Sequence, residues 1–463
     1  MLSVRSLDRG NVTARAFRST TFRLRFVFAL IVLAAVAYFF VIDQVVSQTR
    51  TSVDQIGNHA ERAVAYTNRA LSDLGNREVH EADYLIAPGD ANVAAAEAAS
   101  RDAARANDEL RQAIQDIALS PDEQQLVDQA ALALDEYSTR WGQLNTLHQA
   151  NDTLGAVAVF RYMTDLMRGN VAAPLNQLVA LNEQSLRATY AGQASSQLIT
   201  SGLILVVGVV LSGFLLRLQA EISARMKRTL TVPLLLAALV VIGFTILTLV
   251  KLNQAQNALR QAATSDFVSI QTMSHLRVQA YAAKADRSRY LSDTELAQQY
   301  DQAFAKEATT LAHVGDNRPL SAATFDRVYA AAQQGRITFQ GDLATGLANA
   351  DTPQERQAAL AALDHWGKYL KIDAQIRQLE SSGRHDQAVA LALGDNPGQS
   401  NYEFTQFDQA VGQVIALNQD QFDADLGEVL QATGSYQIWA AVAALLVVGL
   451  SWLGIRARLA EYR

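Results

Sequence analysis

The chain has 463 residues, of which 49% are hydrophobic, and its formal net charge at pH 7 is −7. It contains no cysteine, which excludes disulfides, thiolate metal sites and cysteine nucleophiles, so any exported domain must be stabilised by packing alone. The net charge hides an uneven distribution, because uncharged apolar runs separate short basic segments from long acidic ones.

Four apolar runs are long enough to cross a lipid bilayer, since each approaches or exceeds the ~18–20 residues of a membrane-spanning helix. The runs cover residues 26–42, 197–216, 229–250 and 438–455. Apolar residues extend the first run past Asp43, which is therefore predicted to lie at the outer interface. An uncleaved signal anchor is favoured over a signal peptide, because no small-residue cleavage site follows this run.

Basic residues predict which side of the membrane each segment faces. Residues 1–25 carry six arginines against one aspartate, the connection 217–228 carries four basic residues against one glutamate, and the tail 456–463 carries three arginines against one glutamate. The long loops are acidic, with 10 basic and 20 acidic residues in 51–196, and 14 and 22 in 253–436. Because short cytoplasmic segments are enriched in Lys and Arg, both termini and the connection are predicted to be cytoplasmic and both loops extracytoplasmic.

Helix signals dominate the first loop. A heptad seam predicts one continuous helix from the first run to the turn at Pro88 and Gly89. The seam consists of Val46, Val53, Ile56, Ala60, Ala63, Thr67, Ala70 and Leu74. A second helix is predicted at about 92–119, a third opens with a capping box that begins at Ser120, and a fourth leads from about Pro174 into the second run. This arrangement predicts an antiparallel four-helix bundle.

The second loop repeats this plan, with a capping box that begins at Thr352 and an added helical segment near 319–349. Three short matches occur in the same order in both loops. They are Trp141-Gly142 with Trp366-Gly367, Ala156-Val157-Ala158 with Ala388-Val389-Ala390, and Leu-Val-Ala-Leu-Asn at 178–182 with Val-Ile-Ala-Leu-Asn at 414–418. Their order predicts an internal duplication, to which chance similarity between Ala/Leu-rich helices is the alternative.

The predicted fold class is an all-α membrane protein with four transmembrane helices and two tandem extracytoplasmic helical bundles, a duplicated span–bundle–span unit in the cell membrane. The predicted segments are a cytoplasmic basic segment (1–25), a first span (26–47), a four-helix bundle (48–196), a second span (197–216), a cytoplasmic basic linker (217–228), a third span (229–250), a bundle with an extra helical segment (251–436), a fourth span (437–455) and a cytoplasmic tail (456–463).

Three basic residues of the second loop form a candidate ligand-binding site. Arg287 lies on an apolar helical seam, and Arg277 and Lys284 lie at neighbouring positions, whereas Arg62 and Arg69 of the first loop are predicted to be ordinary flank charges. The seam is Met273, Leu276, Ala280, Ala283, Arg287 and Tyr290. A guanidinium that faces a bundle interior needs a carboxylate partner. That partner is either a ligand carboxylate, bound by two parallel hydrogen bonds, or an Asp or Glu of another helix.

The basic linker is a second candidate for binding. Arg217, Arg225, Lys227 and Arg228 are predicted to contact a cytoplasmic partner or anionic lipid, although the topology rule alone already accounts for their presence. The cytoplasmic segments are too short for a folded output domain, so a signal is expected to pass to a separate protein.

Catalytic motifs are absent from the sequence, and no enzyme activity is expected. Among the seven histidines, only His80 lies in a cluster, with Glu81, Asp83 and Tyr84. Two ligands on one helix face are too few for a structural zinc site. A solvated polar face near the tip of the bundle is predicted instead, and no metal or other cofactor is expected.

The plan of a span, a helical bundle and a helix that returns to the membrane resembles the sensing domain of bacterial chemoreceptors. The stretch 173–182, Ala-Pro-Leu-Asn-Gln-Leu-Val-Ala-Leu-Asn, looks like the last helix of that domain, but the chain lacks the chemoreceptor signalling hairpin. The tandem four-pass form is similar to the GlnX-like membrane sensors of actinobacteria in architecture, length and the matched landmarks. That resemblance implies a relay from an extracytoplasmic solute-binding lipoprotein, which binds acidic amino acids or asparagine, to a cytoplasmic Ser/Thr protein kinase.

Two functions from different classes are compatible with these features. The favoured one is a non-enzymatic transmembrane signalling protein that relays an extracytoplasmic amino-acid or nutrient signal through motion of its continuous helices. The alternative is a membrane scaffold or accessory subunit of a transport or cell-envelope complex. Neither function involves nucleic acid. Chemoreceptors suggest a homodimer by analogy, although four spans per chain already supply a pair of sensing units.

Overall fold

The computed structural model is 90% helical. It describes residues 20–116, 120–226, 231–315 and 318–459. Among these residues, β1 (His313–Val314) and β2 (Arg318–Pro319) form one short antiparallel ribbon. Four helices of the described chain are long and apolar enough to cross a membrane. The prediction of a helical protein with four candidate membrane spans is therefore confirmed.

The chain divides into two compact units. The span unit contains the four apolar runs and consists of Met1–Asp54, Thr189–Arg260 and Asp425–Arg463. The head unit consists of Gln55–Ala188 and Gln261–Ala424. Each segment of the head unit therefore lies between two candidate spans in the sequence.

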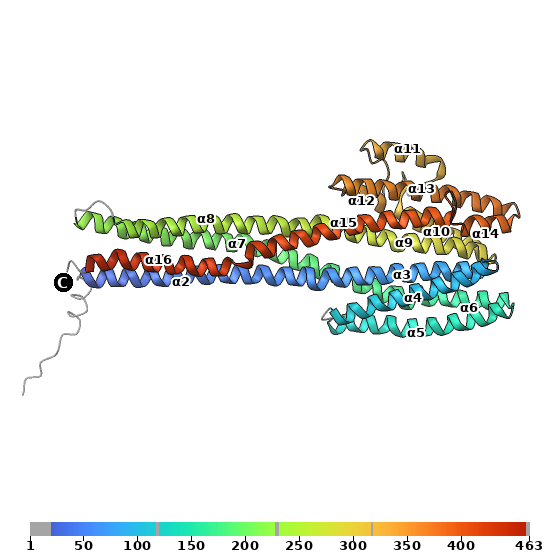
Figure 1. Ribbon diagram of the computed structural model, residues 1–463, viewed down its shortest axis with the longest axis horizontal. Helices are drawn as coiled ribbons and strands as arrows, with labels where there is room; N and C mark the ends of the chain where they lie inside the picture. Colours follow the sequence, from blue (N-terminus) through green and yellow to red (C-terminus); the bar gives the residue numbers. More distant parts are fainter. Residues whose placement is uncertain (1–19, 117–119, 227–230, 316–317, 460–463) are drawn as a thin grey trace, which may run out of the picture. The chain divides into compact units, whose positions relative to one another are not determined.

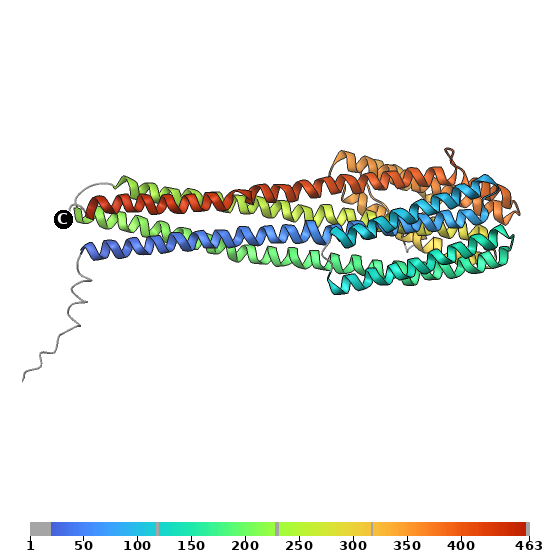
Figure 2. The same ribbon diagram turned by 60° about the horizontal axis from the view of Figure 1, so that its bottom comes forward.

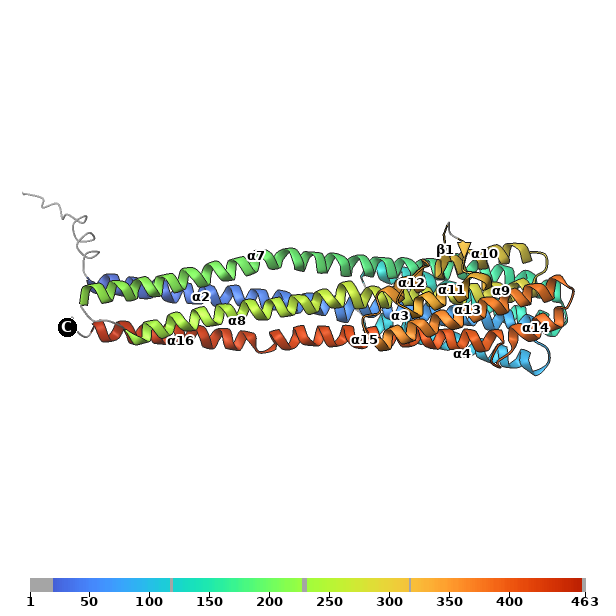
Figure 3. The same cartoon turned by 90° about the horizontal axis from the view of Figure 1, so that it is seen from above.

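Four helical stretches run side by side in the span unit (Figure 2, Figure 3). They are α2 (Thr20–Val53), the second part of α7 (Ala173–Met226), α8 (Val232–Gln261) and α16 (Tyr436–Leu459). One buried apolar cluster draws side chains from all four. Their outward faces are apolar as well, because Leu33, Ile199 and Leu445 expose 67%, 77% and 72% of their surface. Such an exterior suits contact with lipid tails, since water-facing helices carry polar residues outward.

Hydroxyl groups and a glycine bring the other span helices onto α8. The hydroxyl oxygens of Tyr38 (α2) and Thr245 (α8) are 2.8 Å apart, and the Tyr436 hydroxyl of α16 donates to Thr248 Oγ1 at 2.7 Å. At Gly208 of α7, a Cβ atom would lie 2.5 Å from Thr245 Oγ1, so a larger residue would force the two helices apart.

The head unit is built from two runs of helices. The first run consists of η1 (Asp54–Glu61), α3 (Arg62–Ile86), α4 (Asp90–Asp116), α5 (Pro121–Gln149), α6 (Thr153–Leu166), η2 (Met167–Ala172) and the beginning of α7. The second consists of η3 (Ala262–Asp266), α9 (Phe267–Ser292), α10 (Ala297–Leu311), α11 (Ala322–Gln333), α12 (Asp342–Ala348), α13 (Pro353–Ser381), α14 (His385–Leu393) and most of α15 (Ser400–Gly434). The added helical segment predicted for the second loop corresponds to α11 and α12.

Both predicted capping boxes are present. At the start of α5, the Ser120 amide donates to Glu123 Oε2 at 2.7 Å, and the Glu123 amide donates to Ser120 Oγ at 3.4 Å. At the start of α13, the corresponding distances between Thr352 and Glu355 are 2.8 and 3.2 Å. Each box satisfies two amides that would otherwise lack a partner in the first turn, which is why both long helices begin at these residues.

The predicted heptad seam is buried, but the rod that carries it is not α-helical throughout. All eight seam residues are 4% exposed or less. Helical structure continues from Thr20 to Ile86, with η1 as a π-helical segment inside it, and η3 interrupts α8 and α9 in the same way. A π-helical turn holds more residues than an α-helical turn, so each segment rotates the faces of the helices that it joins.

Helix α3 lies at the centre of the head unit, between α4 to α6 and the helices of the second run (Figure 1). One apolar cluster contains Tyr137 and Phe160 of the first run, and another contains Trp366 and Phe407 of the second. Val79 of α3 belongs to the second cluster although α3 itself is part of the first run. The two runs therefore pack through α3 into one unit.

Candidate functional site

Helices α3 and α9 form a close contact between the two runs of the head unit. At Gly75 of α3, a Cβ atom would lie 2.9 Å from the Cβ of Tyr281 on α9. Further along, Ser288 Oγ donates to Asp83 Oδ1 at 2.7 Å. The contacts advance in the same direction along both helices, so the packing is parallel, and it leaves no room for a side chain at position 75.

A buried network of ion pairs crosses this contact. The Arg289 guanidinium of α9 donates to Glu78 of α3 at 2.5 Å and to Asp286 at 2.7 Å. Arg168 of η2 donates to the same Asp286 carboxylate at 2.6 Å. Burial and the neighbouring Asp286 carboxylate raise the pKa of Glu307, on α10, to about 8. Removing one partner of a buried pair typically costs about 3–5 kcal/mol, so the members of the network hold one another in place.

The acidic positions beside His80 are not a solvated face, and that prediction is wrong. Glu81 and Asp83 are 0% and 4% exposed. Glu81 accepts a hydrogen bond from the Tyr137 hydroxyl and pairs with Arg77, whose Nε lies 2.7 Å from its carboxylate. The alternation of polar and apolar residues in the sequence predicts that the polar face of a helix faces solvent. However, α3 is covered by α4 on one side and by α9 on another. Glu81 is therefore buried in an ion pair, and Asp83 is buried with a hydrogen bond from Ser288.

Arg287 is 2% exposed and pairs within the chain. Its guanidinium contacts the Asp373 carboxylate of α13 and lies 3.2 Å from the Asp301 carboxylate of α10. The Phe304 ring centre is 4.4 Å from the guanidinium carbon and covers one face of it. Of the two alternatives for its partner, the geometry favours the carboxylate of another helix, which makes this pair structural.

Arg277 and Lys284 contact other helices than Arg287 does. The Arg277 guanidinium donates two hydrogen bonds, of 2.6 and 2.8 Å, to the Asp408 carboxylate of α15. The Lys284 ammonium lies 4.7 Å from the centre of the Phe404 ring, and burial lowers its pKa despite the nearby Asp83 carboxylate. The three predicted residues therefore have separate partners and do not converge on one site.

The predicted cytoplasmic residues lie at the end of α7 and beyond it. Arg217 is on α7 with its side chain exposed. Arg225 is within the same helix, whereas Lys227 and Arg228 lie outside the described residues. α7 thus continues past the predicted end of the second span at Leu216.

A cavity of about 300 Å³ lies between α3, α9 and α15. Its polar lining consists of Asn68, Arg69, Ser72, Ser274, Arg277, Gln419 and Asp420, and its apolar lining of Ala65, Ile270, Gly412, Ile415 and Ala416. This volume is at the lower end of the range for small-molecule sites, ~300–1,000 Å³. The Arg277 guanidinium in its wall is paired with Asp408, Arg69 lies 3.8 Å from Glu109, and Asp420 adds a carboxylate, so charged groups of both signs line the cavity.

Of the cavity residues, only Arg277 was singled out from the sequence. From the sequence, Arg69 is predicted to be an ordinary flank charge. The α15 residues are not predicted to bind a ligand, because the cavity forms only where three helices from both loops pack together. In α3, Asn68 and Ser72 are only 7% and 4% exposed, and both line the cavity.

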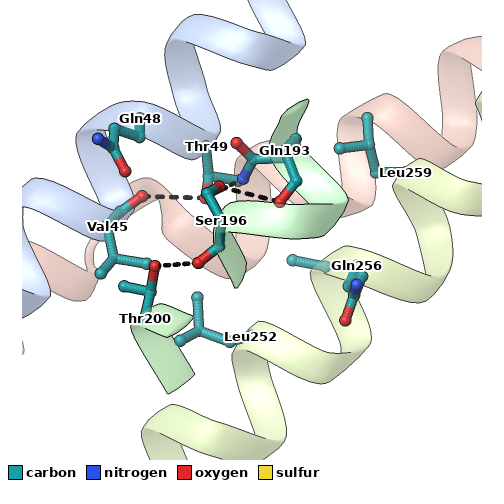
Figure 4. Close-up of a pocket in the computed structure, with 10 residues that line it drawn as sticks. Val45, Gln48, Thr49, Gln193, Ser196, Thr200, Leu252, Gln256 and Leu259 are labelled. Atoms are coloured by element: carbon teal, nitrogen blue, oxygen red, sulfur yellow. Dashed lines mark hydrogen bonds between the residues drawn. The ribbon is translucent and has the colours of Figure 1, made fainter. Parts of the chain in front are cut away.

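A second, smaller cavity lies in the span unit where α2, α7 and α8 meet (Figure 4). Its volume of about 10 Å³ is enough for a single water molecule. The Thr49 hydroxyl donates to the Val45 carbonyl at 3.0 Å, and Gln193 donates to Thr49 Oγ1 at 3.2 Å. The Thr200 hydroxyl donates to the Ser196 carbonyl at 2.5 Å. These groups satisfy one another, so this cavity is a feature of helix packing.

The described residues contain no group of three or more His, Asp or Glu side chains that could hold a metal ion. Comparison of the chain with protein-family models, with curated proteins and with solved structures gives no match.

Proposed function

We propose that the protein is a non-enzymatic transmembrane signalling protein of the cell membrane. In this proposal the head unit is extracytoplasmic and receives an amino-acid or nutrient signal, either directly or through a solute-binding lipoprotein. The spans pass the signal to a separate cytoplasmic partner, such as a Ser/Thr protein kinase.

The observation that carries this proposal is the continuity of helices between the head and span units. α7 is a single α-helix from Ala173 to Met226 and contains residues of both units. Helical structure is also unbroken from Thr20 to Ile86 and from Val232 to Ser292. A continuous helix that shifts, tilts or rotates at one end moves at the other end too. Such helices favour a relay over a static scaffold.

Matching local geometry supports an internal duplication of the sensing unit. In α7, Asn182 Nδ2 donates to the Leu178 carbonyl at 3.0 Å, and in α15, Asn418 Nδ2 donates to the Val414 carbonyl at 2.9 Å. Both asparagines are buried, and each follows a long helix that begins with a capping box in its own loop. Shared composition alone does not account for two buried asparagines with the same hydrogen bond.

The cavity supports direct binding of a small ligand, and the matching position of α7 has a different environment. The position that matches Gln419 of α15 is Glu183 of α7. The Glu183 side chain is hydrogen-bonded to Gln271 and lies near the cations Arg187 and His275. Polar side chains of the chain itself thus surround the position of α7 that matches Gln419.

The test of direct binding uses the full chain in lipid nanodiscs and calorimetric titration with aspartate, glutamate and asparagine. Ala416→Trp fills the cavity from α15, and we expect it to weaken binding at least about tenfold, a loss of ~1.4 kcal/mol. Ala180→Trp is the matched control, because Ala180 lies at the corresponding position of α7, is exposed like Ala416, and is not part of the cavity lining. Equal loss in both variants would contradict the assignment of the cavity.

The test of the relay is capture of partners from native membranes after mild crosslinking, with identification by mass spectrometry. Recovery of a solute-binding lipoprotein together with a cytoplasmic Ser/Thr kinase is the expected result. Recovery of permeases or envelope-synthesis proteins without a kinase would support the accessory-subunit alternative instead.

A further inference from the structure

The fourth span is joined to its outer helix by a break, unlike the other three. α15 ends at Gly434 and α16 begins at Tyr436, with Ser435 between them. No proline is present there, and Gly434 does not adopt a positive φ. Glycine and serine pairs permit a sharp bend without forcing one. The angle of the joint therefore depends on side chains of neighbouring helices that contact α15 and α16.

Arg50 of α2 holds the end of α15. Its Nη2 donates hydrogen bonds of 2.7 Å to both the Thr433 and the Gly434 carbonyls. Carbonyls at the end of a helix lack a partner within that helix, and they carry the negative end of the helix dipole. A guanidinium satisfies both requirements, because it is a donor and a cation.

Asp43, two helical turns before Arg50 on α2, holds the beginning of α16. Its Oδ1 accepts a hydrogen bond of 2.7 Å from Gln437 Nε2 in the first turn of α16. The positive end of the α16 dipole lies there, so an anion is favoured. One helix therefore presents a cation to the end of α15 and an anion to the beginning of α16.

Tyr436 fixes the beginning of α16 from a third helix. Its hydroxyl donates to Thr248 of α8, and its ring stacks on Phe244 with ring centres 5.5 Å apart. α16 is therefore held by both α2 and α8, whereas the hydrogen bonds of Arg50 reach only the end of α15. A change at Arg50 releases α15 and leaves α16 in place.

We propose that Arg50 and Asp43 form a latch that holds a movable joint at Ser435, so that α15 and α16 move as separate rigid segments when the latch opens. The joint makes the fourth span the one that a non-helical residue, Ser435, separates from its outer helix. This inference goes beyond the proposed function, because it holds whichever ligand or partner the head unit binds.

The test measures the angle of the joint through a distance across it. Because the chain contains no cysteine, spin labels attach only to the introduced pair Leu430→Cys and Leu445→Cys, whose side chains are 47% and 72% exposed. A continuous helix would separate these positions by about 22 Å along its axis. Pulsed electron–electron double resonance spectroscopy on the full chain in nanodiscs gives the distribution of distances between the two spin labels.

We expect Arg50→Ala to enlarge a second distance population about tenfold relative to the parent chain, and Asp43→Asn to enlarge it less. Asp43→Asn also keeps the test informative if Arg50→Ala does not fold. Gly434→Ala combined with Ser435→Ala favours a continuous helix, since a Cβ at Gly434 meets no atom within 4 Å. That variant should move the distance towards the continuous-helix value and remove the effect of Arg50→Ala.

Arg111→Ala is the matched control, because Arg111 of α4 is an exposed arginine that pairs with Asp108 three residues before it. The latch is refuted if Arg50→Ala gives the same distance distribution as Arg111→Ala in folded protein. It is also refuted if the continuous-helix variant responds to Arg50→Ala as strongly as the parent does.

Discussion

Single charged residues determine how the head unit packs. Arg77, Arg287 and Arg289 are 4%, 2% and 0% exposed, and each contacts a carboxylate. Replacing a buried ion pair by apolar residues of similar volume is often neutral for stability, whereas removing one partner is costly. These pairs therefore act mainly on specificity, because an incorrect alignment of the helices would bury a charge without its partner and so have a higher free energy.

The raised pKa of Glu307 predicts a pH dependence of stability. A carboxyl whose pKa is about 8 in the folded state and 4.5 ordinarily is more readily protonated when folded. Its contribution to the free energy of unfolding is therefore fully present below pH 4.5 and is lost as the pH rises through 8. Glu307→Gln keeps the neutral form, so we expect its stability to fall less between pH 5 and 9 than that of the parent.

Urea denaturation followed by circular dichroism at several pH values measures this difference. Glu97→Gln is the control, because Glu97 is an exposed residue of α4 that pairs with Arg101 at the surface. Parallel pH profiles of the parent and Glu307→Gln would contradict the assignment of the proton to Glu307.

At the scale of helices, the close approach of α3 and α9 depends on one glycine. A Cβ at Gly75 would lie 2.9 Å from the Tyr281 Cβ, so we expect Gly75→Ala to destabilise the protein by ~1–3 kcal/mol. Gly142→Ala in α5 meets no atom within 4 Å and should stabilise by ~0.5–1 kcal/mol, because alanine favours helix more than glycine does. Thermal melts of both variants give the comparison, and equal shifts would contradict the contact.

Local rules predicted the helices well because each signal is contained in a few neighbouring residues. The Ser120 and Thr352 capping boxes and the turn after Ile86 are where the sequence places them. The π-helical segments and the burial of Glu81 were not predicted, since both depend on how helices from different loops pack. The cavity was missed for the same reason, and Arg277 was predicted to bind a ligand without the partner, Asp408, that orients it.

At the scale of the whole molecule, the distribution of basic residues predicts that the head unit is extracytoplasmic. Single cysteines test this directly, because the parent chain has none to react. We expect a membrane-impermeant maleimide to label Asp122→Cys in the head unit of intact cells, but Ala224→Cys near the end of α7 only after permeabilisation. Both positions are exposed, so accessibility within the fold does not differ between them. The reverse labelling pattern would place the head unit in the cytoplasm.

The ion pairs between the two runs of the head unit favour a gene that encodes both runs in one polypeptide. Glu78 of the first run pairs with Arg289 of the second, and Arg168 of the first run pairs with Asp286 of the second, so a pair of identical runs would lose both ion pairs. A buried charge without its partner is costly, so two identical runs would pack less stably than the two different ones. Each copy of one run needs a copy of the other, and a single polypeptide supplies them in equal numbers, which two separate genes would achieve only through matched expression.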